Sequence, residues 1–141
     1  MISPKVFIDK RTLRAFCRRA RRAYPNEHLE ALFGKALKSG YYVHIFYPFP
    51  HKGTRYMACY ETDELARLHQ EAEDMKLKMI GSIHTHVGIK QCDHPSIGDH
   101  VQGIEDGEEL LGVCNIYVRN KKTHTTFTFC VPSEPLKITL R

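Results

Sequence analysis

The stretch Gly81-Ser-Ile-His-Thr-His-Val-Gly-Ile-Lys-Gln-Cys-Asp-His-Pro-Ser-Ile-Gly-Asp99 brings three potential metal ligands together in the chain. Its first residues continue an apolar run and are typical of a buried strand, in which side chains alternate between two faces. His84 and His86 are therefore expected on one face, within reach of one ion. Ser96 begins a predicted helix, and Asp99 follows it after one helical turn. Two imidazoles and one carboxylate form a three-ligand zinc set that leaves a fourth position for water, as in catalytic sites.

Each half of this motif also has a purely structural explanation. The chain contains nine histidines, so a pair at this spacing can arise by chance. Ser96 with an acidic residue three positions later is also the pattern of a helix capping box. Two polar rings on a buried strand are nevertheless costly unless something binds them. A capped helix start would also orient Asp99, so the structural and metal-binding roles are compatible.

Length and composition predict one globular domain over residues 1–141. Apolar residues make up 42% of the chain and charged residues 26%, which is typical of a folded domain and not of a disordered one. No apolar run approaches the roughly 20 residues that a membrane span needs. The first residues lack the apolar segment of a secretory signal. A cytoplasmic location without a membrane partner is therefore expected.

The five cysteines are scattered along the chain without a C-x-x-C pair, and most are interpreted as reduced, buried thiols. Cys92 is an exception because it lies between the predicted metal ligands, where a ligand or redox role stays open. His94 and His100 lie close to the same ligands in the sequence. They are alternative ligands or hydrogen-bonding partners of the ligands.

The net charge of +5 is concentrated near the N-terminus. Residues 1–22 hold eight of the 21 basic side chains but only one of the 16 acidic ones, so they carry +7 and the remaining chain carries −2. The predicted helix that follows Asp9 has an apolar stripe and an opposite face of arginines, interpreted as solvated, with docking of an acidic partner as the alternative. Neither a zinc-finger spacing nor an aromatic-rich basic strand is present, so no specific nucleic-acid partner is expected.

The order of the predicted elements indicates the fold class. The expected strands and helices are a strand at 6–8, a helix from 10 to 24, strands at 41–47 and 56–60, a helix at 63–77, a strand ending at 86, a short helix near 97–104, and a hairpin of 111–118 and 124–131. This order predicts an α/β (α+β) fold with a mixed, curved β-sheet flanked by helices.

The histidine motif with its Pro-Ser-x-x-Asp continuation resembles the signature of the JAMM metalloproteases, which are the MPN+ or JAB domains. That family also has an upstream glutamate in a segment E-x-x-G-x-L-x-G, after a helix that often ends in Tyr-Pro. This chain has Tyr24-Pro-Asn-Glu-His-Leu-Glu-Ala-Leu-Phe-Gly34, in which Glu27 matches the family glutamate. The resemblance extends from the first helix to the last hairpin and implies a JAB/MPN-like fold.

The chain departs from the family pattern in three places. Glu30 replaces a glycine, Val87 stands where a proline is common, and the loop between the second histidine and the serine is longer than usual. Only the loop length affects whether Asp99 can return to the metal, and a surface loop tolerates such an insertion. Glu30 is also the rival of Glu27 as a base, although its spacing does not fit the family motif.

The resemblance implies a zinc hydrolase. His84, His86 and Asp99 would hold Zn²⁺, which activates a water molecule. Glu27 would act as the general base, and Ser96 would donate a hydrogen bond to the oxyanion of the tetrahedral intermediate. The implied reaction is hydrolysis of an amide or isopeptide bond at the C-terminus of a ubiquitin-like protein or its conjugate. Processing of sulfur-carrier proteins and a non-catalytic MPN scaffold are the alternative hypotheses.

Overall fold

The computed structural model describes residues 5–49, 52–53, 58–59, 62–88, 107, 109–131 and 134–140. The elements in these residues are β1 (Lys5–Ile8), α1 (Lys10–Ala23), β2 (Leu29–Leu37), β3 (Gly40–Pro48), β4 (Lys52–Gly53), β5 (Ala58–Cys59), α2 (Thr62–Asp74), β6 (Lys78–Gly88), β7 (Leu110–Arg119), β8 (Lys122–Val131) and β9 (Glu134–Leu140). Neither helix in this part of the chain is long and apolar enough to cross a membrane.

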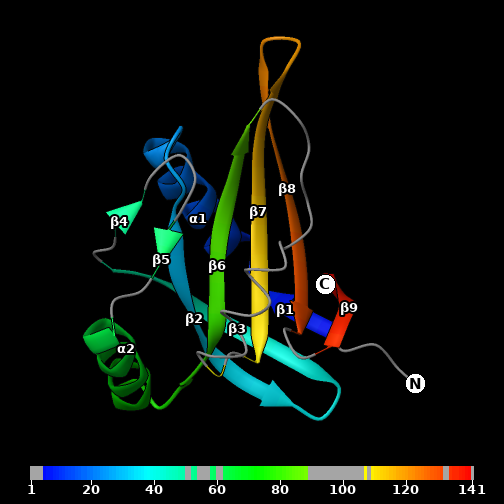
Figure 1. Ribbon diagram of the computed structural model, residues 1–141. Coiled ribbons are helices and arrows are strands. Elements are labelled where there is room, and N and C mark those ends of the chain that lie inside the picture. The colour runs from blue at the N-terminus through cyan, green and yellow to red at the C-terminus, as the bar shows by residue number, and fades with distance from the viewer. Residues whose placement is uncertain are drawn as a thin grey trace.

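The long strands form one mixed sheet that curves until it closes into a barrel (Figure 1). Its strand order is β1-β3-β2-β6-β7-β8-β9, while β4 and β5 form a separate pair. The β1–β3, β6–β7 and β1–β9 pairs are parallel, and the other pairs are antiparallel. The predicted mixed, curved sheet with flanking helices is confirmed. The closure by β9 was not predicted from the sequence.

Helix α1 packs against one face of this sheet. The Asp9 side chain accepts a hydrogen bond from the Arg11 backbone N–H at 3.0 Å and so caps the helix, as predicted. Phe16 and Ala20 are buried among apolar side chains of the strands. The Phe16 ring meets the Phe46 ring edge to face, with 5.2 Å between centroids. The apolar stripe of α1 therefore packs against the sheet in one of the two core clusters.

Helix α2 contributes to a second core. Its Leu68 and Ala72 pack with Leu29 and Phe33 of β2, whereas the alternate residue Leu32 belongs to the core that contains α1. Strand β2 is thus buried on both faces, which explains its almost uninterrupted apolar sequence. The two faces of β2 matter for the site, because residues that alternate along this strand lie in different surroundings.

The end of α2 differs from its predicted position. The helix ends at Asp74, three residues before the expected boundary. Lys76 has a left-handed φ of 59°, and the backbone N–H groups of Lys76 and Leu77 donate to the carbonyls of Glu73 and Ala72, both at 2.9 Å. This is a Schellman motif with lysine in the position that glycine usually occupies. No glycine stands at this position to mark the end of the helix in the sequence.

The β7–β8 hairpin is confirmed. Its turn residues Asn120 and Lys121 have φ values of 53° and 62°, as a two-residue type I′ turn requires. Cys114 is buried on β7, and this burial raises the pKa of its thiol far above the ordinary value. A thiol held in its protonated form is inert, as expected for a structural cysteine. The predicted short helix near 97–104 lies outside the described residues.

Candidate functional site

The structure brings His84 and His86 together at the end of β6. Their Nε2 atoms are 3.0 Å apart, and their ring centroids are 4.9 Å apart. The side chain of His84 is buried and that of His86 is half-buried. Both rings leave the same face of the strand, because they are two residues apart on an extended backbone.

The separation of the two Nε2 atoms can be compared with that of two ligands on one ion. Two imidazole nitrogens at a Zn–N distance of about 2.0–2.1 Å on a tetrahedral zinc are about 3.3 Å apart. The observed 3.0 Å is close to this value. A direct hydrogen bond between the rings also has this length, if one Nε2 carries a proton. The pair therefore fits zinc, and a third ligand distinguishes a metal site from a simple histidine pair.

The third predicted ligand, Asp99, lies outside the described residues. Within the described part of the chain, no group of three or more His, Cys, Asp or Glu side chains could hold a metal ion. The other loop residues that the sequence singled out also lie outside it, namely Cys92, His94, Ser96 and His100. The donor set that the structure describes thus consists of the two histidines.

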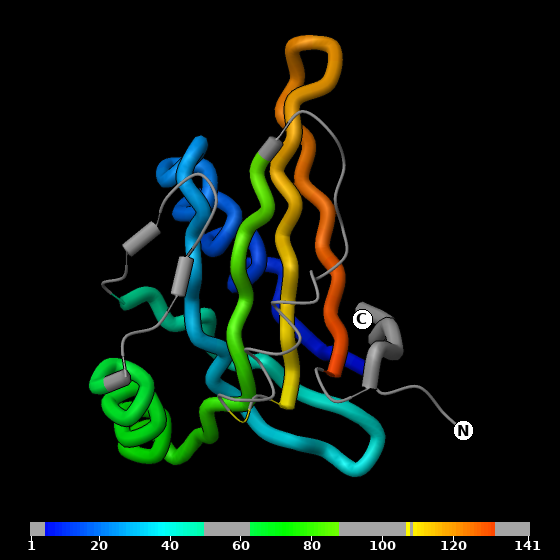
Figure 2. The backbone as a smooth tube through the Cα atoms, in the orientation of Figure 1, coloured from blue at the N-terminus to red at the C-terminus, as the bar shows by residue number. Residues whose placement is uncertain are grey.

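The position of Glu27 follows from the pairing of β2 with β6. The two strands are antiparallel, with Leu29 directly opposite His84. Figure 2 shows the start of β2 and the end of β6 at the same end of the sheet. Continued past Leu29, this register would place residue 28 opposite residue 85 and Glu27 opposite His86. Directly opposite residues share a face of the sheet, so this register assigns Glu27 to the face of the two histidines.

Hydrogen bonds extend the pairing beyond the first residue of β2. The His28 backbone N–H donates to the Thr85 hydroxyl at 2.7 Å, and the Thr85 N–H donates to the His28 carbonyl at 2.9 Å. Thr85 is fully buried and lies between the two histidines of the motif. The residue next to Glu27 is therefore bonded to the residue between the two predicted metal ligands.

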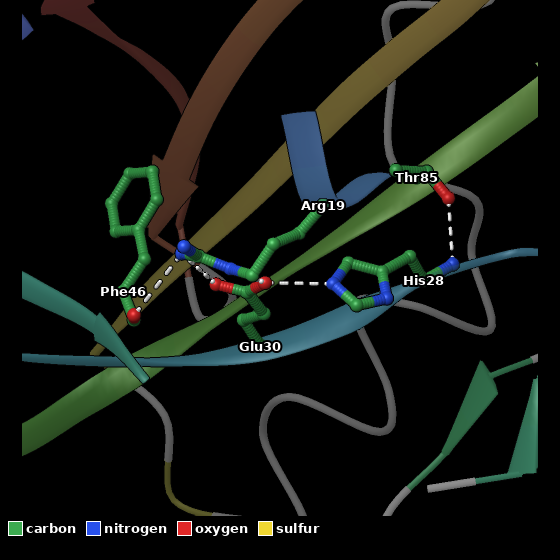
Figure 3. A network of polar contacts seen from close by, with 5 residues as sticks. All are labelled: Arg19, His28, Glu30, Phe46 and Thr85. Atoms are coloured by element: carbon green, nitrogen blue, oxygen red, sulfur yellow. Dashed lines mark hydrogen bonds and ion pairs between the residues drawn. The ribbon is translucent and has the colours of Figure 1, made fainter. Parts of the chain in front are cut away.

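Glu30, the rival of Glu27, faces the other way. It lies opposite Ile83 and is completely buried on the α1 side of the sheet (Figure 3). Its Oε2 accepts from Arg19 Nε at 2.7 Å, and its Oε1 accepts from Arg19 Nη2 at 2.8 Å. His28 Nε2 is a further 2.7 Å from Glu30 Oε2. Glu30 is engaged in this network and is not positioned as a base for the histidine site.

The network around Glu30 was not predicted. The arginine face of α1, which includes Arg19, was interpreted as solvated. Arg19 instead turns inward, with 30% of its side chain exposed, and its hydrogen bond to Glu30 raises the pKa of the guanidinium. The sequence contained a signal for this. A carboxylate within the apolar run of β2 requires a hydrogen-bonded, cationic partner when it is buried.

The mixed, curved sheet with its two helices is a JAB/MPN-like fold. A comparison with known families matches residues 9–130 to the prokaryotic homologs of the JAB domain, and the chain therefore belongs to this family. None of the curated proteins compared with the chain matches it.

Two solved structures are similar to the chain. Protein DSY2949 from Desulfitobacterium hafniense is 17% identical with a TM-score of 0.71, over 96% of this chain and 91% of that chain. AF2198, a JAB1/MPN domain protein from Archaeoglobus fulgidus, is 17% identical with a TM-score of 0.55, over 99% of this chain and 98% of that chain. At these identities the similarity establishes a shared fold.

The buried position of Glu30 leads to a stability prediction. Glu30→Ala leaves the partly exposed Arg19 guanidinium without its buried partner and should lower the free energy of unfolding by roughly 1–3 kcal/mol. Urea denaturation followed by circular dichroism measures this difference. Glu64→Ala is the control, because Glu64 pairs with the exposed Arg67 at 3.6 Å and its loss should cost less than about 1 kcal/mol. Equal effects of the two substitutions would contradict the structural role of Glu30.

Proposed function

We propose that this chain is a zinc-dependent hydrolase that cleaves an amide or isopeptide bond at the C-terminus of a ubiquitin-like protein. The observation that carries the proposal is the 3.0 Å approach of His84 Nε2 to His86 Nε2 on the face to which the β2–β6 register assigns Glu27. Membership of the JAB family, which includes metalloisopeptidases, supports it. The chemistry requires a metal-binding donor set and a separate base, and this face of the sheet offers candidates for both.

The proposed roles follow from the types of side chain. His84 and His86 hold the metal through Nε2, and Asp99 supplies the third ligand. Bound Zn²⁺ supplies a Lewis acid and lowers the pKa of a water molecule to about 7. The Glu27 carboxylate accepts a proton from the attacking water and delivers it to the leaving amine. Ser96 donates a hydrogen bond to the oxyanion of the tetrahedral intermediate.

The proposed substrate is the extended C-terminal tail of a ubiquitin-like protein. An extended tail can bind beside a sheet by adding a strand, with backbone hydrogen bonds giving affinity and side-chain pockets giving specificity. A sulfur-carrier protein has the same kind of tail and is included in this substrate class. A non-catalytic scaffold has no need for a converging histidine pair or a glutamate, and their presence favours the enzyme.

Zinc content tests the metal site without a substrate. Protein purified without added metal should contain about one zinc per chain, and His84→Ala and Asp99→Ala should lose it, because three protein ligands are needed to hold the ion. Plasma mass spectrometry measures the ratio. The control is His44→Ala, because His44 is an exposed histidine on β3 and should keep the metal. A folded wild type without zinc would contradict the proposal.

The role of Glu27 predicts a separation of metal binding from turnover. Glu27→Gln should keep the zinc content of the wild type while cleavage falls by roughly 10²–10⁴-fold, because the general base is lost. Release of a reporter fused to the C-terminus of a ubiquitin-like protein measures the rate, with a panel of such fusions to find the one that is cleaved. Near-normal cleavage by Glu27→Gln would refute its assignment as the base.

A further inference from the structure

We propose that a partly buried hydrogen-bonded network on the α1 side of the sheet holds Glu27 in position beside the histidine pair. The network, called the brace below, consists of the side chains of Arg19, His28, Glu30 and Thr85 (Figure 3). The inference rests on the proposed function, since that function gives Glu27 its role as the base. The brace residues act through Glu27 and are positioning residues, because they face away from the histidine pair.

Side chains near the start of β2 alternate between the two faces of the sheet. Glu30 lies opposite Ile83, on the α1 side, and the side chain of His28 reaches it there. Glu27 is the neighbour of His28 in the chain, and the register assigns it to the opposite face, with His84 and His86. Fixing the backbone of His28 therefore also fixes the point from which the Glu27 side chain leaves the chain.

Thr85 anchors this backbone to the metal-binding strand. The reciprocal bonds between His28 and Thr85, at 2.7 and 2.9 Å, involve both backbone polar groups of His28. The regular strand β2 begins only at Leu29, so Glu27 and His28 precede it. The Thr85 hydroxyl thus links the segment that carries the base directly to the residue between the two metal ligands.

Glu30 and Arg19 anchor the other end of the brace. Glu30 Oε2 lies 2.7 Å from both His28 Nε2 and Arg19 Nε, so one carboxylate oxygen joins the two side chains. Arg19 also donates through Nη2 to the Phe46 carbonyl at 3.4 Å, which ties α1 to β3. The planar guanidinium contacts both oxygens of Glu30, and this two-point contact restricts its orientation. The His28 ring therefore contacts a carboxylate whose orientation is restricted.

The expected consequence concerns the rate of the reaction. A general base must lie within hydrogen-bond reach of the proton that it takes, and a displacement of about 1 Å can reduce turnover roughly 10²-fold. In the proposed function, the substrate does not bind to the α1 side of the sheet. Loss of the brace should therefore lower kcat while KM and zinc content stay unchanged.

The most conservative test is Thr85→Val, which keeps the shape of the side chain and removes the hydroxyl. Cobalt is loaded in place of zinc, and pseudocontact shifts of the Glu27 and His28 amides report their positions relative to the metal. Thr85→Val should change these two shifts, and Thr85→Ser, which keeps the hydroxyl, should restore them. Thr125→Val is the matched control, since the Thr125 hydroxyl accepts from Arg21 Nη2 on the exposed surface. It should leave the shifts unchanged.

A second variant covers the possibility that Thr85→Val does not fold. Glu30→Gln keeps the shape of the side chain and removes its charge, and it should move the same two amide shifts. On a fusion that the wild type cleaves, either folded variant should lower kcat by about tenfold or more with unchanged KM. Unchanged Glu27 and His28 signals in the folded variants would overturn the brace, even if the wild type is an active zinc enzyme.

If the proposed function is wrong but the brace exists, the experiments give a different set of results. If the wild type binds neither zinc nor cobalt, amide hydrogen exchange still tests the brace without a metal or a substrate. The His28 amide should exchange about tenfold faster in Thr85→Val than in Thr85→Ser, because its acceptor has been removed. Equal exchange rates would overturn the brace, and faster exchange without metal binding would overturn only the proposed function.

Discussion

The antiparallel pairing of β2 with β6 is the constraint on which the candidate site depends. Leu29 lies opposite His84 and Glu30 lies opposite Ile83. Continued past Leu29, the same register assigns residue 27 to the position opposite residue 86. A slip of one residue would move every side chain of β2 to the other face. The assigned positions of the predicted base and the two predicted metal ligands therefore follow from one strand pairing.

The two faces of the β2–β6 pair carry different groups of polar residues. One face carries the histidine pair, together with the predicted base in this register. The other face carries Glu30, a completely buried carboxylate that is compensated by a helix arginine and a histidine. The family pattern has a glycine at this position, so the glutamate is a feature of this chain. A buried ion pair is a weak source of stability compared with apolar packing, and its value in fixing a local conformation is the better explanation for its presence.

Much of the fold could be predicted from the sequence, because particular residues determine the local structure around them. The Asp9 cap, the Asn-Lys turn and the alternation of His84 with His86 are local signals, and local hydrogen bonds and backbone preferences decide them. The closure of the barrel could not be predicted, because Pro132 precedes β9 and Pro135 lies within it, and proline is disfavoured inside strands. Arg19 was misassigned because helical periodicity alone cannot tell which arginine meets a buried carboxylate from another element.

The site was predicted as a set of residues, and the structure adds the geometry of some of them. His84 and His86 converge, the register assigns Glu27 to their face, and Glu30 is turned away. The convergence follows from strand periodicity, which the sequence reveals. The orientation of Glu30 follows from the alternation of side chains along β2 and its pairing with Ile83. The sequence allowed either a helix or a strand there.

X-ray absorption at the zinc edge is the most direct test of the central claim, that two histidines and a carboxylate hold a zinc ion with an open position. Four nitrogen or oxygen neighbours at about 2.0–2.1 Å are expected, two of them with the outer-shell scattering of imidazole. His86→Ala should reduce the imidazole contribution or remove the metal. A sulfur neighbour at about 2.3 Å, or a number of imidazoles other than two, would contradict the account and indicate that Cys92 or another histidine binds the ion.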